Sequence, residues 1–183
     1  MRITDPKALR AMAHPTRIDL LDLLGRIGPA TAATCARHLD TSQASCSFHL
    51  RQLAKYGYVE EAEPSGDKRE RLWRIIDHEQ HWSSADGNPA ALELEKVFIE
   101  REATRMAAWT DLRTTISEEW QQAAFISGVS APMTPEELDQ VGKQFMELLE
   151  PYFARIKDHS QIPEGAKVVR VFMHGAPHEP LTP

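Results

Sequence analysis

Residues 35–53 read CARHLDTSQASCSFHLRQL, and this stretch decides the fold. It contains two short helix-forming runs separated by residues 40–42, whose small polar side chains favour turns and helix starts. The apolar side chains fall on one side of each expected helix: Cys35, Ala36, Leu39, Cys46, Leu50 and Leu53. Two short helices that cross closely, with the second one protruding, are typical of a helix-turn-helix.

The second of these helices then presents its remaining face to solvent, namely Gln43, Ala44, Ser47, Phe48 and Arg51. Gln and Arg side chains make bidentate hydrogen bonds to adenine and guanine edges, and Ala or Phe can meet a thymine methyl group. Ser42 and Ser45 stand at the helix N-terminus, where hydroxyls and backbone N–H groups suit a phosphate. We therefore predict that these seven residues contact double-stranded DNA.

A β-hairpin is expected directly after the two helices. Residues 58–63 and 71–76 are strand candidates, and turn-forming residues 64–67 separate them. The hairpin tip carries Lys68, Arg69 and Arg71, which we predict to contact the DNA backbone or minor groove as a wing. Two helices alone would equally suit a hairpin inside any helical bundle, but the basic β-hairpin favours DNA binding.

The net charge of −6 hides an asymmetry. Residues 1–76 contain 12 Lys and Arg against 9 Asp and Glu, whereas residues 77–183 contain 9 against 18. No acidic residue lies between Thr41 and Val59. A locally basic face still attracts phosphates on an acidic molecule, because charges beyond about 8–10 Å are screened at physiological salt.

The rest of the chain is expected to be mostly helical. Helices are predicted over 5–12, 15–27, 90–121 and 134–157, and strands over 123–130 and 167–174, which we expect to pair. The fold class is therefore α+β, mostly α, with an N-terminal winged helix-turn-helix and a helical C-terminal module holding a short two-stranded sheet. The expected domains are residues 1–76 for DNA binding, a linker over 77–89, and residues 90–183 for dimerisation and ligand sensing.

Aromatic residues of the C-terminal module have two interpretations. They line a pocket for a small organic effector, or they pack a core and a dimer seam; the second interpretation is the ordinary one. The two are compatible, since a pocket in a dimer interface couples effector binding to operator spacing. The candidate pocket residues are Phe98, Trp109, Trp120, Phe125, Phe145 and Tyr152.

Several other functions lack a supporting pattern. The sequence has no apolar run long enough to span a membrane and no signal-peptide core at its start, so a cytoplasmic location is expected. His78 and His81 suit a polar linker better than a metal site, and we expect neither a metal nor a cofactor. There is no glycine-rich phosphate loop and no hydrolase or metalloprotease motif, so we do not expect an enzyme.

The N-terminal part resembles the winged-helix regulators of the ArsR type. Three stretches carry the resemblance: residues 8–18 (ALRAMAHPTRI), 42–53 (SQASCSFHLRQL) and 56–59 (YGYV). The resemblance covers residues 5–76 and implies a homodimer on a near-palindromic operator, repressing transcription until an inducer binds. Metal-sensing members carry two cysteines where this chain has Thr31 and Ala33, so that metal site is expected to be absent.

Two rival functions remain open from the sequence. In the first, a ligand-sensing protein keeps its winged helix for protein contacts without binding an operator. In the second, residues 90–183 form an enzyme, although they offer no evident nucleophile–base pair. The operator sequence, the regulated genes and the effector are not encoded in any pattern we find.

Overall fold

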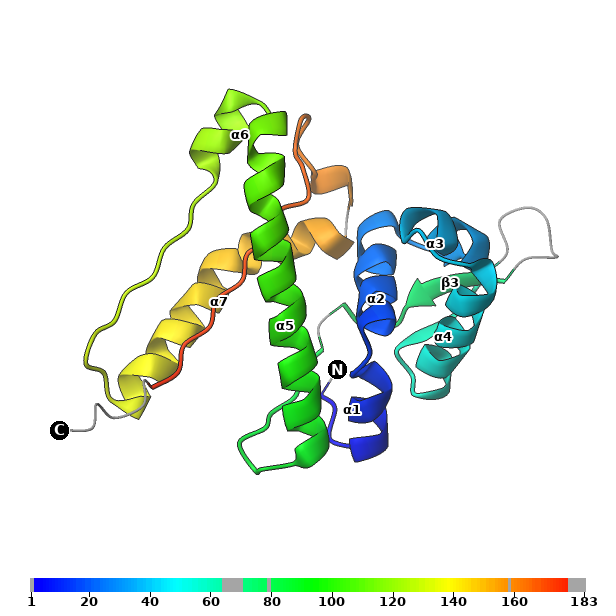
Figure 1. Ribbon diagram of the computed structural model, residues 1–183, viewed down its shortest axis with the longest axis horizontal. Helices are drawn as coiled ribbons and strands as arrows, with labels where there is room; N and C mark the ends of the chain where they lie inside the picture. Colours follow the sequence, from blue (N-terminus) through cyan, green and yellow to red (C-terminus); the bar gives the residue numbers. More distant parts are fainter. Residues whose placement is uncertain (1, 64–70, 79, 158, 178–183) are drawn as a thin grey trace. The chain divides into compact units, whose positions relative to one another are not determined.

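The computed structural model describes residues 2–63, 71–78, 80–157 and 159–177. The chain divides into two compact units, Met1–Thr110 and Asp111–Pro183. The first unit contains α1 (Pro6–Met12), α2 (Pro15–Ile27), α3 (Ala32–His38), α4 (Gln43–Lys55) and most of α5 (Pro89–Leu112), drawn from blue to green in Figure 1.

Local signals set the limits of these helices. Asp5 caps α1, because its carboxylate accepts a hydrogen bond from the Lys7 amide at 3.0 Å. Thr31 and Ser42 cap α3 and α4 in the same way. Gly57, just after α4, has φ +74°, a left-handed conformation that glycine adopts at little cost. The predicted helices over 5–12 and 15–27 and the helix-turn-helix are thus confirmed.

A three-stranded antiparallel sheet completes the winged helix. Strands β2 (Val59–Ala62) and β3 (Leu72–Ile75) form the predicted hairpin, with Glu61 opposite Trp73. A third strand, β1 (Ala30–Thr31), pairs with the other edge of β3, so the order is β1-β3-β2. The sequence analysis missed β1, because two residues between a helix stop and a helix start show no alternation of polar and apolar side chains.

One apolar core holds the first unit together. It combines leucines from α1, α2 and α4, both cysteines, Trp73 of β3 and the first turns of α5. Tyr58 is fully buried and its hydroxyl donates a hydrogen bond to the Ala8 carbonyl oxygen at 2.8 Å, which ties the start of the hairpin to α1. Ala90, Ala91 and Leu94 at the start of α5 are fully buried in the same core.

The second unit contains η1 (Arg113–Thr115), α6 (Glu118–Ala123), α7 (Pro135–Lys157) and η2 (His159–Gln161). The single helix predicted over 90–121 is wrong beyond Leu112. The hydroxyls of Thr110 and Thr115 donate to backbone carbonyls of the preceding turn, and Ile116 is extended, so the helix ends and α6 begins anew. The predicted capping box of α7 is confirmed by reciprocal hydrogen bonds between Thr134 and Glu137.

The two strands predicted in the C-terminal module do not form. Residues 124–134 and 166–177 belong to no strand or helix, so no strand pair joins them in the described part of the second unit. Their β-branched and aromatic side chains gave the strand pattern, but Phe125, Ile126, Val168 and Val169 are exposed. Strand propensity reflects packing on a pleated surface, and these segments have no such surface beneath them.

Candidate nucleic-acid interface

The turn between α3 and α4 brings the two helices close together. Ala36 is buried at the crossing, and its carbonyl oxygen accepts a hydrogen bond from the Thr41 amide at 3.1 Å. Asp40 occupies the left-handed region with φ +48°, which lets the chain reverse within three residues. A small residue at the crossing and a left-handed residue in the turn let α4 lie close against α3.

The inner face of α4 is fully buried, as predicted. Cys46, Leu50 and Leu53 have no exposed surface, and neither does Cys35 on α3. Burial raises the pKa of the Cys35 thiol to about 11, with Cys46 beside it adding to the effect, and burial also raises the pKa of Cys46. Both thiols are therefore protonated at neutral pH and act as small apolar side chains, with little nucleophilic character.

The outer face of α4 holds the predicted base-reading residues. Gln43, Ala44, Phe48 and Arg51 are exposed, and Ser47 is half-buried. All of these residues come from one helix, and they occupy the face opposite the buried one. The structure thus brings together the predicted residues of α4 on a single solvent-exposed surface.

Arg51 is held in place by its own helix. Its Nη1 donates a hydrogen bond of 2.6 Å to the Ser47 hydroxyl, one turn earlier. A guanidinium fixed in this way loses less side-chain entropy when it binds a base edge or a phosphate. The sequence analysis placed both residues on the outer face but did not anticipate this bond, which the spacing of four residues permits.

The N-terminus of α4 is the candidate phosphate site. The Ser42 hydroxyl accepts a hydrogen bond from the Ser45 amide at 3.1 Å and so acts as the N-cap. No acidic residue lies in the first turn of α4. The helix dipole and the first backbone N–H groups therefore favour an anion there.

Exposed basic side chains also lie outside α4, on α3 and beside β3. Arg37, on α3, is exposed and donates to the Thr34 hydroxyl at 3.2 Å; the sequence analysis did not single it out. Arg71, in the hairpin, forms an exposed ion pair with Glu61 at 2.9 Å. Exposed pairs contribute only about 0–1 kcal/mol, so this one does not prevent Arg71 from meeting a phosphate. Lys68 and Arg69 lie outside the described residues.

Two histidines and an arginine lie close together where the start of α2 meets α4. The rings of His14 and His49 lie 4.6 Å apart, and their Nδ1 atoms and Arg17 Nε are buried without a hydrogen-bond partner. Burial lowers the pKa of His14 and of His49, and the nearby Arg17 charge lowers both further. The two imidazoles are therefore neutral packing groups at neutral pH.

The predicted pocket residues divide between the two units. Phe98 and Trp109 lie on α5, and Phe98 packs edge-on against Trp82 at 5.6 Å. Trp120, Phe125, Phe145 and Tyr152 belong to the second unit. Phe125 is 76% exposed and Tyr152 52% exposed, so these two side chains do not line a closed cavity within the second unit.

No three His, Cys, Asp or Glu side chains among the described residues lie close enough together to hold a metal ion. Within the same residues, no helix has both the length and the apolar character needed to cross a bilayer.

Residues 12–61 match the family described as a helix-turn-helix domain. This part of the chain is therefore similar to helix-turn-helix domains. The match begins at the end of α1 and ends within β2, so it contains the whole of α2, α3 and α4. No curated protein matches the sequence.

Several solved structures are similar to the chain at low sequence identity. An apo mutant of ZitR from Lactococcus lactis is 18% identical over 77% of this chain and 83% of its own, with a TM-score of 0.36. The homodimeric winged helix-turn-helix DNA-binding domain of Mb0332 from Mycobacterium bovis is 20% identical over 52% and 76%, with a TM-score of 0.36. A probable transcriptional regulator from Pseudomonas aeruginosa is 22% identical over 60% and 70%, with a TM-score of 0.33.

Proposed function

We propose that this chain is a sequence-specific DNA-binding transcription regulator that acts as a homodimer on a near-palindromic operator. One observation carries the proposal: α4 buries Cys46, Leu50 and Leu53 completely and leaves Gln43 and Arg51 exposed on the opposite face. A protruding helix with this division is the element that enters the major groove in helix-turn-helix proteins.

The side chains of α4 divide into two roles. Gln43, Ser47 and Arg51 read base edges, while Ala44 and Phe48 meet thymine methyl groups. The N-terminus of α4, with Ser42 and Ser45, binds a phosphate and fixes the position of the helix on the duplex. The wing residues Lys68, Arg69 and Arg71 add further phosphate contacts, which carry no sequence information themselves.

A second copy of the chain is the proposed partner. Leu92, Ile99 and Met106 recur every seven residues along α5, and all three are exposed in the single chain. Apolar residues at this spacing are typical of a helix that pairs with another helix. Among the described residues between 103 and 177, no side chain is fully buried. This degree of exposure is expected of a module that buries its apolar side chains against a second copy of the chain.

Repression and its relief by a small organic effector rest on the ArsR-type resemblance. In the dimer, the two recognition helices would lie about 34 Å apart, one turn of the DNA helix. Such a dimer bound to its operator would block transcription. An effector that binds one dimer geometry better than the other would shift this occupancy. Measuring operator affinity against candidate apolar metabolites tests this part.

The experiment that tests the proposal is selection from a random-sequence duplex library, followed by binding assays on the selected DNA at several salt concentrations. We expect an enriched pair of inverted half-sites and a steep loss of affinity with rising salt, because phosphate contacts release counterions. A chain that uses its winged helix only for protein contacts would enrich no sequence and show no such salt dependence.

A further inference from the structure

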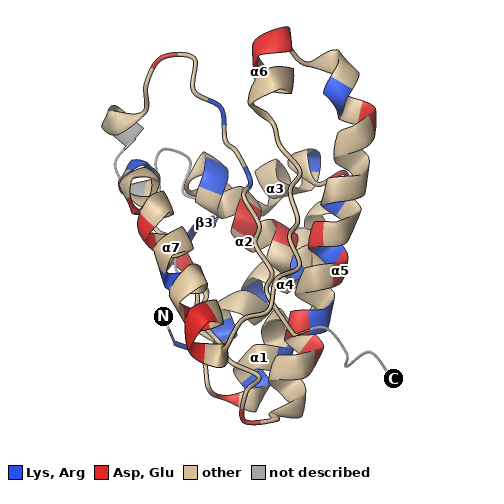
Figure 2. Ribbon diagram, turned by 90° about the vertical axis from the view of Figure 1, so that its left-hand side faces the viewer, with Lys and Arg blue, Asp and Glu red and all other residues tan. Residues whose placement is uncertain are grey.

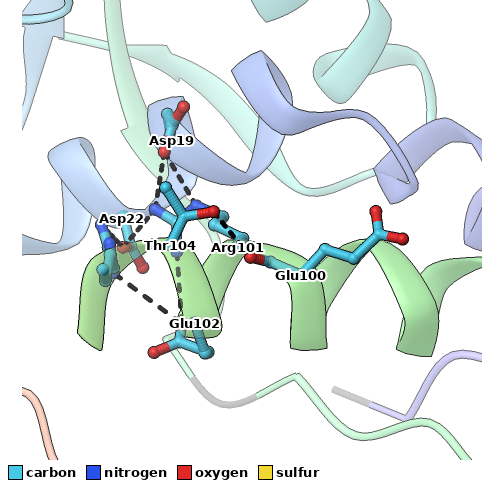
Figure 3. Close-up of polar contacts among 7 residues, drawn as sticks. Asp19, Asp22, Glu100, Arg101, Glu102 and Thr104 are labelled. Atoms are coloured by element: carbon cyan, nitrogen blue, oxygen red, sulfur yellow. Dashed lines mark hydrogen bonds and ion pairs between the residues drawn. The ribbon is translucent and has the colours of Figure 1, made fainter. Parts of the chain in front are cut away.

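An ionic network joins α2 to α5 within the first unit. Arg101 of α5 is only 8% exposed, and its guanidinium reaches two carboxylates on α2 (Figure 3). Its Nε donates to Asp19 Oδ1 at 2.8 Å, and its Nη2 donates to Asp22 Oδ2 at 2.7 Å. These partners are 82 and 79 residues away in the sequence, so the contact connects the helix-turn-helix to the helix that follows it.

Neighbouring charges complete the network. Arg105 pairs with Asp22 at 2.6 Å, and Glu102, whose side chain is 1% exposed, lies 3.4 Å from Arg101. Burial alone would raise the pKa of Asp22, but hydrogen bonds and charges from Arg101 and Arg105 hold it below its ordinary value. Burial would likewise lower the pKa of Arg101, but Asp22 and Asp19 raise it above its ordinary value. Asp22 and Arg101 are therefore both charged at neutral pH.

The value of such a network lies in geometry more than in stability. A buried ion pair repays the loss of hydration poorly, so apolar residues of similar volume would serve equally well as packing. A guanidinium, however, is a rigid planar fork. Asp19 and Asp22 stand nearly one helical turn apart on α2, and engaging both fixes the rotation and the sliding of α5 against α2.

α2 packs directly against α4, the proposed recognition helix, so the orientation of α5 relative to α2 also sets its orientation relative to α4. The buried leucines of α2 share one core with Cys46, Leu50 and Leu53 of α4. Beyond its buried first turns, α5 carries the exposed apolar residues Ile99 and Met106, which flank Arg101 along the helix. Figure 2 shows that other charged residues also lie along this helix, whereas Arg101 and Glu102 are both buried.

We propose that Arg101 is a positioning residue that sets the distance and angle between the two recognition helices of the dimer. The proposal rests on the function proposed above, because it requires a dimer that pairs through α5. Arg101 does not contact DNA in this mechanism. Its hydrogen bonds to Asp19 and Asp22 fix the orientation of α5 relative to α2. The pairing of the two α5 helices in the dimer then sets the half-site spacing that both α4 helices can bind at once. Loss of the lock lets each winged helix rotate on its own, and spacing selectivity falls.

The test compares paired and single half-sites. Duplexes carry the half-sites selected by the wild-type chain at the selected spacing, at that spacing plus about 5 base pairs, half a turn, and as one half-site alone. The first variant is Arg101→Met. The second, called the neutral set, is the triple variant Asp19→Asn/Asp22→Asn/Arg101→Gln, in which uncharged amides replace Arg101 and both α2 carboxylates, so that neither carboxylate remains without its partner. The matched control is Lys96→Met, which removes a charge from an exposed pair on the same helix.

The wild-type chain and the control are expected to prefer the selected spacing by about tenfold or more, in the range of typical coupling between sites. Both Arg101 variants are expected to lose most of this preference while binding a single half-site within about twofold of wild type. Circular dichroism reports whether each variant folds. If Arg101→Met does not fold, the spacing preference of the neutral set decides the test.

Three results would overturn the inference. Folded Arg101 variants that keep the spacing preference would show that the network does not set it. Equal weakening on single and paired sites would assign Arg101 a merely structural role. A wild-type chain that binds single half-sites but has no spacing preference would refute the positioning role and leave base reading intact, whereas no duplex binding at all would refute the proposed function itself.

Discussion

Two nearby positions on α4 provide a sharp test of its division into faces. Leu50 is fully buried, whereas Phe48, two residues earlier, is 49% exposed. Leu50→Ala removes buried carbon atoms and leaves a cavity, which costs about 2–5 kcal/mol of unfolding free energy. Phe48→Ala gives up only the covered half of a ring whose full burial is worth about 1.5–3 kcal/mol, so we expect about 1 kcal/mol.

The assay is urea unfolding followed by circular dichroism and tryptophan fluorescence, at one fixed protein concentration because a dimer makes stability concentration-dependent. DNA affinity is measured on the same proteins under conditions in which both are folded. We expect Leu50→Ala to lower stability most and Phe48→Ala to lower DNA affinity most. Equal losses of stability, or an unchanged DNA affinity in Phe48→Ala, would refute the assignment of the two faces.

Three further predictions concern stability. Tyr58→Phe removes the hydrogen bond from the buried hydroxyl to the Ala8 carbonyl oxygen and should cost about 0.5–1.5 kcal/mol in urea unfolding; a cost near zero would mean that this bond adds nothing to stability. Burial lowers the pKa of His14 and His49, so stability should be complete above the ordinary histidine pKa of about 6.5 and fall as the pH drops below it; the double change to Gln should flatten this pH dependence, and an unchanged slope would assign it to other groups. Thr134→Ala removes half of the α7 capping box and should cost about 1 kcal/mol of helix stability, measured as faster amide exchange in the first turn, whereas unchanged exchange would contradict the cap.

The winged helix was predictable because its signals are local. Asp5 and Ser42 are helix N-caps, and Gly57 adopts the left-handed backbone conformation that ends α4. The apolar spacing of Cys46, Leu50 and Leu53 then fixes which face turns inward. From the inward face, the outward one follows without further information, and that face contains the candidate site.

Features that depend on distant partners were not predictable. The strand β1 exists only because β3 passes beside it. The segments around Phe125 and Val168 have strand composition but no partner strand among the described residues of the second unit. α5 contains eight charged residues, and nothing in the sequence shows that Arg101 and Arg105 are the ones that turn towards the carboxylates of α2.

The measurement that tests the central claim most directly is the sequence preference of Arg51→Ala, determined by the same random-library selection as for the wild-type chain. The side chain lies on the outer face of α4 and touches no buried group, so the variant should fold normally. We predict a loss of about 1–3 kcal/mol on the selected operator and a relaxed preference at one base pair in each half-site. A selected sequence and affinity identical to those of the wild type would contradict the claim that this face of α4 reads DNA, and equal weakening on every sequence would make Arg51 a phosphate contact.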